Sequence, residues 1–311
     1  MEQAQTPTEA SVTTVETPAH PVKAEGTSST TVTPQSAAAS CPTCAAAQAS
    51  ANMSPPSCVY VIGHIEPRYP SLAIEKEVRQ ATARAGDSSK DTDRQVMQKV
   101  LHDPNNRYLV RRLCWVLLVQ GIEHYILVPR DPADYQQLVD AYRAEPNPGD
   151  LELVIGVRGP IANPEICNGL LVPILIFDQI YAFDRKSLLD SIPKPKEGDP
   201  KKFLAAAGEM LDRIMQQTDN AGATDADRAL NYLAVRYDRI YSLAAEQFAS
   251  NASFTSIDVL PSPLSGTRNI VNVILGFTDR ASDVVSKYFV GVDVTECWPF
   301  LVTRMSPYYD R

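Results

Sequence analysis

The chain has 311 residues, of which 44% are hydrophobic and 21% charged, with a formal net charge of −8 and a pI near 5.1. This composition supplies enough apolar material for a sizeable core, and the acidic balance disfavours nucleic acid as a partner. No apolar run approaches the roughly 18 residues of a membrane span, and no secretory signal is apparent. We therefore expect a cytoplasmic protein, not associated with membranes, whose six cysteines are reduced thiols.

The first 56 residues differ in composition from the rest of the chain. They contain no Leu, Ile, Phe, Tyr or Trp and consist mostly of Ala, Thr, Ser, Glu and Pro. Such a segment cannot bury enough apolar area to offset an ordering entropy of roughly 1–2 kcal/mol per residue. We predict a disordered tail over residues 1–56 and a folded domain over residues 57–311.

Apolar periodicity predicts the first elements of this domain. Residues 58–65 are β-branched and aromatic, as in a buried strand, and in the helix that follows Pro70 an ion pair between Glu75 and Arg79 is expected. Gln120-Gly121 indicates a hairpin. The next elements are a helix over 93–102, strands over 113–119 and 124–128, a helix capped by Asp131-Pro132, and strands over 151–157 and 170–177.

The second half begins with a Pro-rich linker over residues 192–200. Pro173, inside the strand before it, favours an edge or a bulge at that point. Two long helices follow, one capped by Asp199-Pro200 and one that starts at Thr224 and carries apolar residues as far as Phe248. Strands over 269–277, 284–294 and 300–304 then form a C-terminal meander. The order predicts an α+β fold with mixed or antiparallel sheets and packed helices.

Cys41-Pro-Thr-Cys44 is the sharpest motif in the sequence. Two thiolates at this spacing can chelate one tetrahedral metal ion, with Cys58 and His64 as the nearest additional ligands. A second Cys pair is missing, so an unliganded pair in a linker is the alternative. Zinc is the one cofactor that the sequence suggests.

Three polar residues alternate at the end of the first strand. On an extended chain His64, Glu66 and Arg68 share one face, which suggests a polar binding patch or a solvated edge.

Arg158 lies in a loop framed by Gly and Pro after a strand, where Arg is suited to bind carboxylates. Asp178, after the next strand, is a candidate acid near that loop. The alternative is a structural Arg that satisfies backbone carbonyls.

Motifs for catalysis are missing. Gly26-Thr-Ser28 resembles a subtilisin-type serine motif but has no accompanying Asp or His motif. Cys114 and Cys167 are interpreted as packed thiols rather than nucleophiles. There is no Gly-rich phosphate loop, so no nucleotide cofactor is expected. These features favour a protein that is not an enzyme.

Several blocks in register resemble a known family, the C-terminal domain of unknown function of the cyanobactin maturation proteases PatG and PatA. The blocks are Tyr60–Pro70, Asn106–Trp115, Val154–Ile161, Asn220–Asp225, Asn231–Tyr237, Leu264–Arg268 and Ser306–Arg311. The similarity covers roughly residues 57–311, and the Cys41–Cys44 motif resembles the segment just ahead of it.

In that family the domain follows a subtilisin-like protease that cuts or macrocyclises a ribosomally made peptide. The resemblance therefore implies a pathway and no catalytic residues, and this sequence shows no protease domain. The leading expectation is a non-catalytic accessory domain that binds a precursor peptide, the maturation protease or another pathway enzyme. The alternatives are a peptide-modifying enzyme or hydrolase with a spatially assembled site, and a zinc-stabilised structural module.

Overall fold

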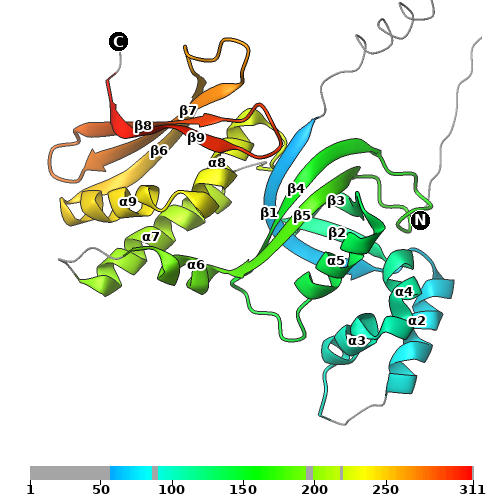
Figure 1. Ribbon diagram of the computed structural model, residues 1–311. Helices are drawn as coiled ribbons and strands as arrows, with labels where there is room; N and C mark the ends of the chain where they lie inside the picture. Colours follow the sequence, from blue (N-terminus) through cyan, green and yellow to red (C-terminus); the bar gives the residue numbers. More distant parts are fainter. Residues whose placement is uncertain (1–56, 86–89, 194–198, 218–219, 310–311) are drawn as a thin grey trace, which may run out of the picture. The chain divides into compact units, whose positions relative to one another are not determined.

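The computed structural model describes residues 57–85, 90–193, 199–217 and 220–309 (Figure 1). The predicted tail, with Cys41 and Cys44, lies outside these residues. No helix in the described part of the chain is both long enough and apolar enough to span a membrane.

A closed five-stranded barrel occupies the first half of the described chain, in the order β1-β2-β3-β5-β4. Its neighbouring strands are antiparallel except β3 and β5, which run parallel. Pro173 is the first residue of β5 and lies beside a bulge in β4, as its sequence position predicts. The strands are β1 (Cys58–Arg68), β2 (Cys114–Val119), β3 (Ile122–Pro129), β4 (Asp150–Ile161) and β5 (Pro173–Asp184).

The barrel core is shared with short helices that pack against it (Figure 1). Trp115 and Phe177 are its largest fully buried aromatic residues. The predicted helix over 93–102 is confirmed and begins with a capping box at Thr92. The helices are α2 (Leu72–Ala85), α3 (Asp93–His102), α4 (Arg107–Arg112) and α5 (Tyr135–Ala141), with 3-10 turns η1 (Pro104–Asn106) and η2 (Pro132–Asp134).

The second half is a four-stranded antiparallel sheet with helices packed on it (Figure 1). The sequence predicts three of its strands, and β6 is an addition to them. The strands, in sheet order, are β6 (Ala252–Pro261), β7 (Ile270–Asp279), β8 (Val285–Asp293) and β9 (Phe300–Tyr308). The helices are α6 (Arg185–Ser191), α7 (Pro200–Met215), α8 (Asp225–Arg236) and α9 (Arg239–Ala249).

The predicted long helix after Thr224 is interrupted at Tyr237 and Asp238. Its capping box between Thr224 and Asp227 is present, but the chain leaves the helix at Tyr237 and re-enters it at Arg239. The buried hydroxyl of Tyr241 donates to the carbonyl of Ala234 at 2.6 Å. A side chain therefore satisfies a carbonyl that a continuous helix would pair with a backbone N–H.

Strand β1 belongs to both halves. Its odd residues Val59 and Val61 face the barrel core, whereas Tyr60 and Ile62 pack with α7, α8 and β7. The backbone of Tyr60 donates to the carbonyl of Gly222 at 2.9 Å. Gly222 has φ +69°, and a Cβ there would lie 2.5 Å from the carbonyl oxygen of Tyr60, so only glycine fits this contact.

The prediction of reduced thiols is wrong for four of the six cysteines. Cys58 is bonded to Cys297, and Cys114 to Cys167, with Cα atoms 4.8 and 5.6 Å apart. The first disulfide joins the start of β1 to the loop before β9, and the second joins β2 to the loop between β4 and β5. Spacing along the chain does not reveal these pairs, because 239 and 53 residues separate the partners.

Candidate functional site

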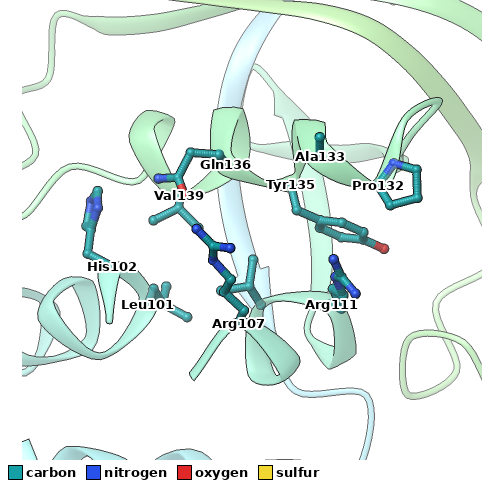
Figure 2. Close-up of a pocket in the computed structure, with 10 residues that line it drawn as sticks. Leu101, His102, Arg107, Arg111, Pro132, Ala133, Tyr135, Gln136 and Val139 are labelled. Carbon is teal, nitrogen blue, oxygen red and sulfur yellow. The ribbon is translucent and has the colours of Figure 1, made fainter. Parts of the chain in front are cut away.

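A pocket of about 240 Å³ lies between α3 and α4 on one side and η2 and α5 on the other (Figure 2). Buried Leu101, Val110 and Val139 form its apolar part. Its polar part consists of the side chains of His102, Arg107, Arg111, Tyr135 and Gln136. We call this site the basic pocket.

Arg107 and Arg111 give the pocket its charge. They lie one turn apart on α4, so their side chains share a face, and Figure 2 shows them extending toward α5. Both are exposed, and neither guanidinium has a hydrogen bond or an ion pair with another described residue. The adjacent Arg112 differs, because it donates to Glu77 at 2.9 Å.

Buried contacts hold the backbone of α4 in place. Leu109 and Val110 pack into the barrel core, and the indole N–H of Trp115 donates to the carbonyl of Val110 at 2.9 Å. Asn106 donates from its amide to the carbonyl of Val100 at 3.1 Å and so ties α4 to the end of α3. The two arginines therefore project from a fixed base.

Tyr135 and Gln136 line the pocket from α5. Burial raises the pKa of the Tyr135 phenol, and the nearby guanidinium of Arg111 acts in the opposite direction. The hydroxyl therefore remains a hydrogen-bond donor at neutral pH. The Gln136 amide donates to Asp140 at 2.8 Å. The described residues that line the pocket include no carboxylate and no thiol, and their donors suit binding of an anion.

None of the five binding candidates named from the sequence lines the basic pocket. His64 lies with its Nδ1 3.8 Å from Glu152 Oε2, whereas Glu66 accepts from Arg94 at 3.0 Å. Arg68 pairs with Glu123. The alternating residues on β1 therefore have separate partners.

Arg158 and Asp178 are not brought together either. The loop predicted around Arg158 is wrong, because pairing with β5 extends β4 through Arg158 to Ile161. The Arg158 side chain is exposed there, and its backbone N–H donates to the carbonyl of Ser57. Asp178 forms a bidentate ion pair with Arg130, which follows β3. Asp178 is thus paired within the fold, with an arginine that the sequence does not single out.

A second cluster of charged groups surrounds Glu152 on β4. Its carboxylate is almost fully buried and accepts from the backbone N–H of Ile65 at 3.2 Å. Burial raises its pKa to about 7. Asp150, also buried, pairs with Arg143. In the described part of the chain, no three His, Cys, Asp or Glu side chains are placed to hold a metal ion.

Residues 197–308, from α7 to the end of β9, match the family model "PatG C-terminal". This part of the chain is similar to the PatG C-terminal family. A solved structure described as "PatG Domain of Unknown Function" is similar over 81% of this chain and 98% of its own, with a TM-score of 0.65 and 20% identity. The two proteins share a fold. No curated protein matches the chain.

The resemblance read from sequence blocks is thereby confirmed. The basic pocket lies outside the PatG C-terminal match, in α3 to α5. The sequence did carry its signal, since Arg107 and Arg111 are four residues apart. That spacing identifies one face only when the segment is known to be helical.

Proposed function

We propose that this protein is a non-catalytic accessory domain that binds a peptide in the maturation of ribosomally made peptide products. The basic pocket carries the proposal, because it combines unpaired cations, neutral donors and apolar contact surface at one concave site. These groups can bind and orient a ligand. The lining offers no nucleophile paired with a base, which most covalent peptide chemistry requires.

The PatG C-terminal match supports the pathway in this proposal. The cyanobactin maturation proteases, which the chain resembles in sequence, act on a precursor peptide, so that peptide or the protease itself is the proposed partner. The proposed role is to hold one of them, and we retain the cytoplasm as the proposed location.

Calorimetric titration of the full chain with a cyanobactin precursor peptide tests this function. We expect saturable binding, and the peptide should keep its mass when the same mixture is analysed by mass spectrometry. A scrambled peptide of the same composition is the control. If neither the precursor nor the maturation protease binds, the proposal is wrong.

A second function, general acid–base chemistry, is favoured by Glu152 alone. A carboxyl with a pKa near 7 beside an imidazole at 3.8 Å is a typical acid–base arrangement. This alternative requires the precursor peptide to change in mass during incubation. Glu152→Gln should then abolish the change, and conversion that persists in that variant excludes this alternative.

A further inference from the structure

We propose that the basic pocket recognises an acidic peptide segment, whose carboxylates pair with Arg107 and Arg111. This inference rests on the proposed peptide-binding function and specifies the chemistry that is recognised. It follows from the charge balance of the pocket, the spacing of the two arginines and the apolar surface between them.

The charge balance leaves two cations without counter-ions. Like charges one helical turn apart repel each other, and no described carboxylate pairs with either guanidinium. Elsewhere in this acidic chain arginines commonly have acid partners, as Arg112 has Glu77 and Arg130 has Asp178. A bound anion would supply the missing counter-charge at the pocket.

The spacing of the arginines favours two carboxylates on one peptide. Four residues of α-helix rise about 6 Å, which sets the separation of the bases of the two side chains along the helix axis. Acidic side chains one turn apart on a helix, or two residues apart on a strand at about 6.6 Å, have nearly the same separation. Each guanidinium can then hold one carboxylate through two parallel hydrogen bonds.

The surroundings favour a peptide over a polyanion such as nucleic acid. The chain carries a net charge of −8, and Asp131, Asp134 and Asp140 lie on the same turns as the pocket residues of η2 and α5. A long polyphosphate would extend past the pocket and meet more of this acidic surface than a short acidic segment does. Leu101, Val110 and Val139 line the pocket, but each is at most 4% exposed, so they add only a small apolar contact next to the acids.

Selection from a random library of 12-residue displayed peptides on the immobilised full chain tests this inference. We expect Asp and Glu to be enriched at least threefold over the input, with apolar residues beside them. The best peptide should then lose at least tenfold in affinity for the double variant Arg107→Gln and Arg111→Gln, because charge-assisted hydrogen bonds are lost. Its counterpart with every acid replaced by the amide should bind as weakly.

The matched control is the double variant Arg84→Gln and Arg304→Gln. These arginines are exposed on α2 and β9, and their replacement changes the net charge by the same amount. It should bind like the wild type, and circular dichroism should show both variants folded. Selected peptides that lack acids, or that bind the Arg107/Arg111 variant equally well, overturn the acidic specificity while leaving peptide binding intact. If no peptide is selected, both this inference and peptide binding fail.

Discussion

Glu152 lies where β1 leaves its pairing with β4 and begins to pair with β2. Gly63 is the last residue of β1 opposite β4, and His64 the first opposite β2. The Glu152 carboxylate lies where the two strands separate. It accepts a hydrogen bond from the backbone N–H of Ile65, for which no strand supplies an acceptor on that side. A polar side chain here completes the backbone pairing, but burial penalises its charged form.

This burial makes stability depend on pH. Because the pKa of Glu152 rises from 4.5 to about 7 on folding, the folded chain binds the proton more tightly than the unfolded chain between these values. The resulting stabilisation is fully present below pH 4.5 and is lost as pH rises to 7, by about 3 kcal/mol. Between pH 4.5 and 7, the unfolding free energy of Glu152→Gln, measured by urea unfolding, should therefore rise by about 3 kcal/mol relative to that of the wild type.

Glu165→Gln is the control for the pH series, because Glu165 is exposed in the loop between β4 and β5. Its stability relative to wild type should stay nearly constant with pH. If the stability of Glu152→Gln relative to wild type were also independent of pH, the pKa of the Glu152 carboxyl would not change on folding.

Asn220 and Asn231 connect the two halves of the described chain. Their buried amides bond each other reciprocally at 2.8 and 3.0 Å, and Asn231 also donates to the carbonyl of Tyr60 at 2.9 Å. Tyr60, Asn220 and Asn231 all occur in the sequence blocks that carry the family resemblance. At these three positions the family resemblance therefore reflects packing around β1.

We expect Asn231→Ala to destabilise the protein by about 2–4 kcal/mol. The substitution leaves the Tyr60 carbonyl and the Asn220 amide buried without this partner, and each incurs a desolvation penalty. The midpoint of urea unfolding measures the loss. Asn105→Ala, at an exposed residue of η1, should change stability by no more than about 0.5 kcal/mol. Equal effects of the two substitutions would contradict a structural role for the Asn231 amide.

At the scale of elements, the sequence alone predicts the helices and strands that have a long apolar pattern or a capping residue of their own. The helix over 93–102 and the hairpin at Gln120-Gly121 agree with the structure, where both turn residues have positive φ. The division between α8 and α9 is not predictable in this way. Apolar residues continue with helical spacing across Tyr237, and the interruption depends on tertiary contacts of the kind that Tyr241 makes.

The interruption provides a third test. Tyr241→Phe keeps the ring in the core but removes the donor to the Ala234 carbonyl, so we expect a loss of about 1–2 kcal/mol in unfolding free energy. Tyr309→Phe, at an exposed position, is the matched control. Full stability of Tyr241→Phe would mean that water or another group satisfies this carbonyl equally well.

The sequence alone does not predict the basic pocket, and the reason is physical. Helix α4 has only six residues, too few for a stable helix in isolation, and it exists because Leu109 and Val110 pack into the barrel core. The candidates His64, Glu66 and Arg68 were visible because they lie on one strand, where alternation does not depend on tertiary contacts. The two arginines reach a common site only after a tertiary contact has made their segment helical.

At the scale of the whole molecule, the disulfides bear on where the protein works. Disulfides persist in oxidising compartments and are rare in the cytosol. We propose a cytoplasmic location, and the two disulfides are evidence against it. The redox state of Cys58, Cys114, Cys167 and Cys297 in the cell therefore tests this location.

The Cys114–Cys167 disulfide closes a loop across 53 residues of sequence and lies in a small buried cluster with Val116 and Ala162. Loop closure of this length restricts the unfolded chain, so the double variant Cys114→Ser and Cys167→Ser should lose about 2–4 kcal/mol. Urea unfolding of the oxidised protein, with thiol alkylation and intact mass to count the disulfides, measures both quantities. The wild type should resist alkylation at both cysteines until it is unfolded and reduced. Rapid alkylation of the native protein, together with unchanged stability of the variant, would show that these residues function as thiols and would remove the objection to a cytosolic location.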